Sequence, residues 1–373
     1  METAPSDIQK HDSFIADNFL SPPNLEEFFK LLPPDLSEWI EVFLKLQIHG
    51  VKSHETVRAV KSDLNKFKGF FEYYYQSSDI RKWFPRTTQR FINHLAGEKG
   101  QKPKTINRNL VSLRSFAKWL ISVRPDLLTL GDPFKGIRPP VQEPIRPKGL
   151  NDRQVKHILD AAYHLICQNY PDESLIKVHS CRQEWHKKGH RKMKRPFRDY
   201  AIIMLLLNGG LRRSEICNLN ISQLQGRHLK HVKCKGNLYR DVLLGEETIK
   251  AIKGYMEEER AVDCQILTAS EALFLPSASR KHRNQNGRLS PRLINVIVSN
   301  IEKETNKNLP KEEHIKLHPH IFRHTHAYQI LKHGRSLPYL QKRLGHQSMN
   351  FLALYAQMPE TEEMELLNGA EFT

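Results

Sequence analysis

Apolar residues recur every three or four positions in four stretches of the first third of the chain, at 36–44, 57–74, 91–95 and 106–120. Such spacing puts the apolar side chains on one face of a helix and therefore predicts four amphipathic helices. Asp35 and Ser37 provide cap chemistry for the first of them. Because the connections between the stretches are short, we expect one helical bundle over residues 34–131.

The segments on either side of this bundle have a different composition. Residues 1–33 are polar and contain several prolines, which predicts a flexible or loosely docked N-terminal arm. Residues 132–149 contain five prolines and predict an extended interdomain linker. Helical periodicity resumes after the linker, with Asn151 as a candidate cap. We expect a second domain over residues 150–358, followed by a C-terminal tail over residues 359–373.

The second domain combines helical patterns with one hairpin pattern. A strongly apolar stretch is expected to form a helix that stops at Gly209, with Ser214 as the cap of the next helix. The alternating segment 229–244 has a Gly-Asn turn in its middle, which predicts a β-hairpin. Two shorter helical stripes at 321–331 and 337–344 are each followed by a glycine. The pattern is that of a mainly helical domain with a small β-hairpin.

The charge of the chain points to a polyanionic partner. Lysine and arginine outnumber aspartate and glutamate by 58 to 41, which gives a formal net charge of +17. Cations in such number can displace the counterions that condense on a nucleic acid, although charge alone does not separate DNA from RNA or from an anionic membrane. No apolar run reaches the roughly 18 residues of a membrane span, and the N-terminus has no signal-peptide core. Five cysteines without CxxC spacing predict reduced thiols in a cytoplasmic protein.

Basic residues cluster at two places where DNA contact is expected. At the start of the helix over 106–120, lysines and arginines stand beside threonine and asparagine, which suits phosphate contact combined with reading of base edges. The candidate DNA-binding residues there are Lys104, Thr105, Asn107, Arg108, Arg114 and Lys118. Residues 177–198 carry nine Lys or Arg against one Glu and predict an exposed basic insertion or loop that touches DNA. For both clusters, a merely solvated basic face is the alternative.

Side chains suited to phosphate chemistry follow one another in the second domain. Arg212 comes directly after the glycine break, where its planar guanidinium can donate two hydrogen bonds to a phosphate. Lys235 lies at the turn of the predicted hairpin. His320 and Arg323 are three residues apart and share one face of a helix.

A glycine-histidine pair and a tyrosine complete this series: His346 follows Gly345, and Tyr355 lies nine residues after His346. In order and spacing, the series resembles the catalytic domain of the tyrosine recombinase, or phage integrase, family. The matching motifs are Gly210-Leu211-Arg212 with Ser214-Glu215, Lys235, His320-Ile321-Phe322-Arg323, Gly345-His346 and Tyr355. The resemblance covers about residues 35–357, because a basic helical domain before a linker is similar to the family's core-binding domain.

The resemblance implies an α+β protein, with a SAM-like helical core-binding domain before a mainly helical catalytic domain that contains a small β-sheet or hairpin. It implies that Tyr355 attacks a DNA phosphate and forms a 3′-phosphotyrosine. Arg212 and Arg323 would stabilise the charge on the phosphate oxygens.

The resemblance also gives roles to the remaining residues of the series. His320 would assist deprotonation of the tyrosine, and His346 would hydrogen-bond the phosphate. Lys235 would protonate the leaving 5′ oxygen. Glu215 would orient the neighbouring basic groups.

The same resemblance implies a partner and an assembly. We expect double-stranded DNA with specific recombination sites, bound by a homo-tetramer that exchanges strands through a Holliday junction, with a monomer or dimer in solution. The expected event is integration, excision or transposition of a mobile element. No cofactor or metal is expected, because the covalent intermediate conserves the phosphoryl bond energy. The alternatives are a type IB topoisomerase and a DNA-binding regulator that does not cleave.

Two histidine-containing segments and the tail allow other interpretations. The first segment could hold a metal through His318, His320, His324 and His326. No HExxH glutamate accompanies these residues, so packing or hydrogen bonding is preferred for His324 and His326. The second segment lacks a fourth zinc ligand beside Cys181, His186 and His190. The acidic tail after Tyr355 either docks on a neighbouring protomer or is a frayed terminus.

Overall fold

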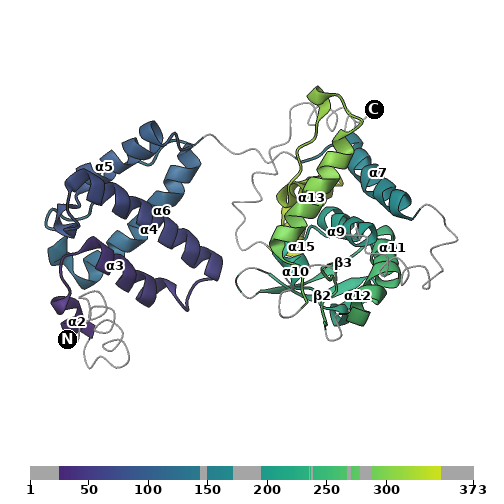
Figure 1. Ribbon diagram of the computed structural model, residues 1–373, viewed down its shortest axis with the longest axis horizontal. Helices are drawn as coiled ribbons and strands as arrows, with labels where there is room; N and C mark the ends of the chain where they lie inside the picture. Colours follow the sequence, from purple (N-terminus) through teal and green to yellow (C-terminus); the bar gives the residue numbers. More distant parts are fainter. Residues whose placement is uncertain are drawn as a thin grey trace, which may run out of the picture. The chain divides into compact units, whose positions relative to one another are not determined.

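A computed structural model describes residues 25–142, 149–170, 195–234, 236, 238–266, 270–277 and 287–345 of the 373-residue chain. The chain divides into two compact units, residues 1–144 and residues 145–373. The division falls inside the segment 132–149 for which the sequence predicts a linker. Each unit is described by itself (Figure 1).

The N-terminal unit is a helical bundle. Its helices are α2 (Leu25–Leu31), α3 (Leu36–Phe43), α4 (His54–Tyr75), α5 (Pro85–Asn93) and α6 (Pro103–Val123). Two of them continue as π-helical turns, α3 into η1 (Leu44–Ile48) and α5 into η3 (His94–Glu98). Short 3₁₀ turns form η2 (Ile80–Lys82) and η4 (Pro125–Leu127). The four predicted amphipathic helices are thereby confirmed as α3 to α6.

Aromatic side chains fill the core of this bundle. Trp39, Phe67 and Phe116 are fully buried, and Phe67 lies 5.2 Å from Phe91, ring centroid to ring centroid. Such pairs add to the burial of their large apolar area. The predicted N-cap is present: the Asp35 carboxylate accepts hydrogen bonds from the backbone N–H groups of the first helical turn.

The bundle begins earlier in the chain than the sequence predicts. Helix α2 lies within the predicted arm 1–33, and Phe28, Phe29 and Leu32 are buried in the core. The Phe29 ring lies 5.9 Å from the ring of Trp39, centroid to centroid. The apolar residues around α2 thus extend the bundle, and the arm boundary at residue 33 is wrong; residues 1–24 lie outside the described residues.

The C-terminal unit is built around a helix that is apolar on all sides. This helix, α9 (Pro196–Asn208), has all seven residues from Ala201 to Leu207 buried. A helix that is apolar on every face needs neighbours all around it. The surrounding helices are α7 (Asp152–Asn169), α11 (Glu246–Tyr255) and α14 (Pro319–Lys332).

The remaining helical elements of this unit are shorter or lie farther out. They are α10 (Arg213–Cys217), η6 (Ile221–Gln223), η7 (Met256–Arg260), α12 (Ala261–Ile266), α13 (Pro291–Asn306), η8 (Lys311–Glu313) and α15 (Leu337–Leu344). The predicted cap Asn151 starts α7, where its side chain accepts the Gln154 N–H at 2.8 Å. No helix of the described part is long and apolar enough to cross a membrane.

A three-stranded antiparallel sheet covers part of the core, in the order β1 (Leu224–Gln225), β2 (His228–Lys233) and β3 (Tyr239–Leu243). The predicted hairpin is confirmed as β2 and β3, whereas the two-residue strand β1 was not predicted. The register pairs Val232 with Arg240 and is irregular between Leu229 and Val232. The irregularity includes His231, which has a left-handed φ of 51°.

The prediction for the basic segment 177–198 is wrong at its C-terminal end. Residues 171–194 lie outside the described residues, but Arg195 and Arg198 are buried at the start of α9. Arg195 Nε donates to Asp263 Oδ2 at 2.8 Å, and Arg198 Nη2 pairs with Asp199 Oδ1 at 2.8 Å. The prediction of an exposed insertion is therefore wrong for residues 195–198, where these two arginines pair inside the fold.

Candidate active site

A sharp backbone turn after α9 positions Arg212. The turn passes through Gly210, whose φ is +59°, and a Cβ on this residue would lie 2.4 Å from Cδ2 of His326. Only glycine fits such a left-handed position against a packed ring. Arg212 then stands immediately before α10. The predicted cap Ser214 is wrong, because the Glu215 carboxylate accepts the backbone N–H of Arg212 at 2.9 Å and satisfies the start of this helix.

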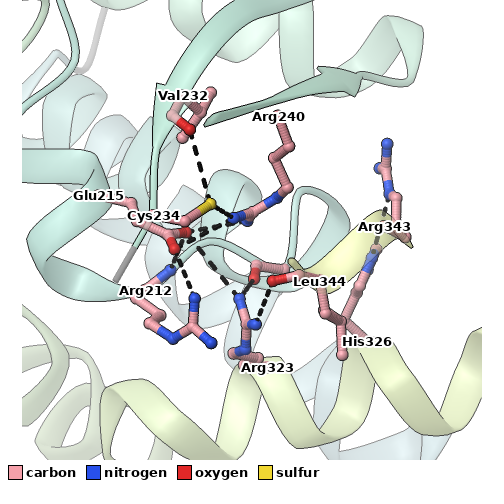
Figure 2. Close-up of polar contacts among 10 residues, drawn as sticks. Arg212, Glu215, Val232, Cys234, Arg240, Arg323, His326, Arg343 and Leu344 are labelled. Carbon is pink, nitrogen blue, oxygen red and sulfur yellow. Dashed lines mark hydrogen bonds and ion pairs between the residues drawn. The ribbon is translucent and has the colours of Figure 1, made fainter. Parts of the chain in front are cut away.

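Arg323 reaches the same turn from α14. Its side chain is buried, and its guanidinium donates to the backbone carbonyl of Gly210 and, at 2.6 Å, to that of Leu344. These bonds connect the turn before Arg212 with the end of α15. The two arginines of the predicted phosphate clamp are thus brought together from distant parts of the sequence (Figure 2).

Glu215 lies between these arginines and is 2% exposed. Its carboxylate pairs with Arg212 Nη1 at 2.7 Å and lies 3.9 Å from Arg323 Nη1. A third guanidinium, that of Arg240, donates through Nη1 and Nη2 to the two carboxylate oxygens at 3.1 and 2.9 Å. Burial alone would raise the pKa of Glu215, but the bonds and charges of Arg240 and Arg323 and the Arg212 N–H hold this pKa below its ordinary value. Glu215 is therefore ionised and joins three arginines, as Figure 2 shows.

Arg240 was not singled out in the sequence. An arginine on a short strand is ordinary in composition, and its partner Glu215 lies 25 residues earlier in another element. Only the hairpin register, which places Arg240 opposite Val232, turns its side chain toward the arginine cluster. The predicted hairpin was a partial indication of this role, because residues of the hairpin that point inward face the core of the C-terminal unit.

His320 lies one helical turn before Arg323 on α14 and is exposed. Partial desolvation and the charges of neighbouring groups, first among them Arg323, lower its pKa from the ordinary 6.5. A neutral imidazole can accept a proton from a hydroxyl group. His320 is thus suited to the base role that the resemblance implies.

The other histidines of this segment have structural partners. The His318 ring accepts the Ile321 N–H at the start of α14, and His326 Nδ1 donates to the Leu207 carbonyl at 2.8 Å. Burial lowers the pKa of His324 to about 4 and that of His326 to about 3, so both rings are neutral near pH 7. Within the described residues, no group of three or more His, Cys, Asp or Glu side chains is arranged to hold a metal ion; Cys181, His186 and His190 lie outside them.

Three residues of the predicted catalytic series, Lys235, His346 and Tyr355, lie outside the described residues. The residues directly before the first two are described. Gly345 ends α15 with a φ of +63°, and a Cβ there would lie 3.0 Å from Cys234 Sγ. The side chain of Cys234, directly before Lys235, therefore packs closely against the backbone directly before His346.

The predicted DNA-binding residues of α6 fall into two groups. Lys104 and Lys118 are exposed and Thr105 is half-buried. The other three have partners in their own unit: Asn107 donates to the Pro140 carbonyl at 2.9 Å, Arg108 Nη2 pairs with Asp63 Oδ1 at 2.8 Å, and the Arg114 guanidinium lies 5.0 Å from the centre of the Phe134 ring. Asp63 is fully buried and also accepts the Ser112 hydroxyl at 3.0 Å, so this ion pair joins α4 to α6.

Comparison with known proteins assigns the chain to a class. Residues 184–362 match the model of the phage integrase family, and residues 40–123 match that of the phage integrase N-terminal SAM-like domain. The two matches together span well over half of the chain, and each lies within one of the two units. The chain belongs to the phage integrase family, whose members are tyrosine recombinases.

Particular relatives cover most of the chain. It is 29% identical over 322 residues to the tyrosine recombinase XerC of Thermodesulfovibrio yellowstonii, which covers 84% of this chain and 89% of the relative. It is 26% identical over 335 residues to XerC of Bacillus subtilis, covering 87% and 93%.

Solved structures share the fold at lower identity. One is the XerH site-specific recombinase bound to a palindromic difH substrate in a post-cleavage complex, with a TM-score of 0.61, 17% identity and coverage of 89% of this chain and 95% of that one. Another is the Tn1549 transposon integrase in complex with a circular intermediate DNA, with a TM-score of 0.58, 19% identity and coverage of 90% and 100%. The predicted α+β fold with a SAM-like N-terminal bundle is confirmed.

Proposed function

We propose that this protein is a site-specific tyrosine recombinase that cleaves and rejoins duplex DNA through a 3′-phosphotyrosyl intermediate. In the proposed step, the Tyr355 hydroxyl oxygen attacks the phosphorus while His320 assists removal of its proton. The bond from phosphorus to the 5′ oxygen breaks, and Lys235 protonates that oxygen. The reverse reaction with another 5′-hydroxyl joins the strands.

Arg212 and Arg323 stabilise the charge that develops on the phosphate oxygens, and His346 hydrogen-bonds the phosphate. The observation that carries this proposal is the convergence of the two arginines on one buried carboxylate, Glu215. The carboxylate bonds Arg212, and the Gly210 and Leu344 carbonyls bond Arg323 beside it. Both guanidinium groups are thus held before a substrate arrives, so little reorganisation is needed when the phosphate binds. The role predicted for Glu215 is thereby supported.

The lowered pKa of His320 also supports the proposal. A base must be neutral to accept a proton, and this histidine is kept neutral first by its partial burial and then by the charge of Arg323. Exposed Lys104 and Lys118, together with Thr105, are proposed to contact DNA from the N-terminal unit.

The proposed setting is that of a mobile element, with integration, excision or transposition carried out in the cytoplasm by a homo-tetramer through a Holliday junction. Two other activities would use the same residues differently. A type IB topoisomerase would relax supercoiled DNA that lacks any specific site, and a regulator of this fold would bind DNA without cleaving it. Sequencing the junctions that form beside the gene in its natural replicon tests the mobile-element setting.

A covalent adduct is the direct test of the proposed chemistry. The Tyr355→Phe variant, which should bind without cleaving, serves to select target DNA from fragments of the natural replicon. The unchanged protein is then mixed with this DNA, nicked just downstream of the cleavage position. The short fragment that carries the free 5′-hydroxyl then diffuses away, and the adduct persists. We expect a protein–DNA band on a denaturing gel and none with Tyr355→Phe.

The outcomes separate the three activities. An adduct formed by Tyr355→Phe would show that another residue is the nucleophile. An adduct on every nicked DNA, with relaxation of plasmids that lack the site, would favour the topoisomerase. Site-specific binding without any adduct would favour the regulator.

A further inference from the structure

Arg240 of β3 has contacts that extend beyond Glu215. Its Nη1 donates to Cys234 Sγ at 2.6 Å, in addition to the two bonds to the carboxylate. Cys234 is the residue directly before Lys235, and its backbone N–H donates to the Leu238 carbonyl at 2.6 Å across the hairpin turn. The Arg240 guanidinium thus joins the hairpin turn to the arginine cluster.

The same guanidinium packs against the end of α15. A Cβ on Gly345 would lie 3.2 Å from Arg240 Nη1 and 3.3 Å from its Cδ. Glycine at this position therefore permits a close approach, and a Cβ would force these side-chain atoms to shift by a few tenths of an ångström. Gly345 directly precedes His346, so Arg240 contacts the chain next to two members of the catalytic series and bonds the carboxylate that holds a third, Arg212.

The physical character of Arg240 suits a fixed structural link. Its side chain is 7% exposed, and the carboxylate that it binds is 2% exposed. Burial would lower the pKa of Arg240, but its bonds to Glu215 raise this pKa above the ordinary value, so the group stays charged. The planar guanidinium can bond two carboxylate oxygens and a thiol at the same time, which a lysine ammonium on a flexible stem does not reproduce.

We propose that Arg240 is a positioning residue for the hairpin turn, and that it holds Lys235 where this lysine can protonate the leaving 5′ oxygen. This inference rests on the proposed function. Arg240 does not touch the reacting atoms in the proposed step; it acts through Cys234 on one side and through Glu215 on the other. General acid catalysis depends on the position of the acid to within a fraction of an ångström.

A substrate that needs no general acid distinguishes positioning from a merely structural role. When sulfur replaces the bridging 5′ oxygen, the leaving group is a thiolate, which departs without a proton because thiols are far more acidic than alcohols. Arg240→Lys keeps a positive charge beside Glu215 but loses the simultaneous bond to Cys234. We expect this variant to form adduct about 10- to 100-fold more slowly on ordinary DNA, part of the effect typical of a general acid. Its rate on the sulfur-substituted DNA should be within about threefold of that of the unchanged protein.

A matched control lies on the same hairpin. Asp241 pairs with Lys230 Nζ at 2.7 Å on the exposed side of the sheet. Asp241→Asn disturbs the hairpin without touching Glu215 or Cys234, and should cleave both substrates like the unchanged protein. A second variant, Cys234→Ala, removes only the hairpin side of the link and should show the same rescue, so a folding failure of Arg240→Lys would not end the test.

Three results would overturn the inference while leaving the proposed function intact. The first is rescue of Lys235→Ala by sulfur without rescue of Arg240→Lys and Cys234→Ala. The second is unchanged cleavage of ordinary DNA by both variants, and the third is equal slowing by Asp241→Asn. If Lys235→Ala itself is not rescued, the general-acid assignment fails and the inference falls with it. If the unchanged protein forms no adduct, the proposed function fails first.

Discussion

Replacing Glu215 with glutamine tests whether one buried carboxylate holds the arginine cluster together. The substitution keeps the shape of the side chain and removes its charge. At present the carboxylate accepts bonds from Arg212 and Arg240 and lies 3.9 Å from a guanidinium nitrogen of Arg323. The amide NH₂ group of a glutamine would turn a donor toward at least one of these donors. We expect both a loss of charge balance and a loss of hydrogen bonds.

The exposure of the three arginines sets the size of the effect. Arg240 and Arg323 are 7% and 5% exposed, so water cannot replace the lost carboxylate for them. Arg212 is 22% exposed and can recover part of its solvation. Removing one partner of a buried ion pair typically costs about 3–5 kcal/mol, and because Arg212 is partly exposed we expect a loss of about 3 kcal/mol.

The expected loss depends on pH with a definite sign. The folded-state pKa of Glu215 lies below its ordinary value of 4.5. A carboxyl group of this kind stabilises the fold above its unfolded pKa, and the contribution disappears as pH falls through the lowered folded value. The difference in unfolding free energy between the unchanged protein and Glu215→Gln should therefore be full near pH 7 and shrink below about pH 4.5.

Urea unfolding measures this difference, with far-UV circular dichroism reporting on the whole chain. Tryptophan fluorescence mainly follows the N-terminal unit, which contains Trp39, Trp83 and Trp119, and should not shift. Glu313→Gln is the matched control, because Glu313 forms an exposed pair with Arg153 at 3.2 Å and its loss should change stability by less than about 1 kcal/mol. Equal losses for the two variants, or a loss that stays constant with pH, would refute the reasoning.

Three further predictions concern other parts of the structure. Gly210→Ala should lower the free energy of unfolding by about 2–3 kcal/mol in the same urea experiment, because its Cβ would clash with His326. Gly226→Ala is the control, with a similar φ of +57° but open space around the Cβ, and should lower it by only about 1 kcal/mol. Equal losses for the two variants would exclude the clash. The acid limb of the adduct rate against pH should lie below 6.5, because neutral His320 is the active form and its pKa is lowered; a limb at or above 6.5 would contradict the base role. Asp63→Asn should lower the free energy of unfolding of the N-terminal unit by about 2 kcal/mol, because the buried carboxylate pairs with Arg108 and accepts the Ser112 hydroxyl. Tryptophan fluorescence during urea unfolding measures this loss, and an unchanged urea midpoint would show that the link between α4 and α6 is dispensable.

Features that depend on neighbouring residues were predictable from the sequence. Asp35 and Asn151 cap their helices as predicted, because a cap needs only its own side chain and the next two or three backbone N–H groups. The helical periods and the hairpin were confirmed for the same reason. The error at Ser214 is also local: a glutamate that reaches back to the start of α10 satisfies the N–H group that a serine would otherwise cap.

Features that depend on distant partners were not predictable. Arg195 belongs to a run of cations that favoured DNA contact, yet it pairs with Asp263, 68 residues later, inside the core. A count of charges cannot distinguish a cation that faces solvent from one whose counterion arrives from another helix. Phe28 and Phe29 were likewise assigned to an arm, because the prolines around them favour an extended chain and the helix between those prolines is short.

The catalytic series was found in the sequence although its geometry was not, and the arrangement around Glu215 explains the difference. Motif spacing identifies Arg212 and Arg323 because each motif is short. Within the described residues, the Glu215 carboxylate lies beside all three guanidinium groups, which come from elements far apart in the sequence. A phosphodiester in the proposed reaction would bring further negative charge to these groups. Their fixed positions therefore prepare the cluster for the charge that builds up on phosphate during the proposed strand cleavage.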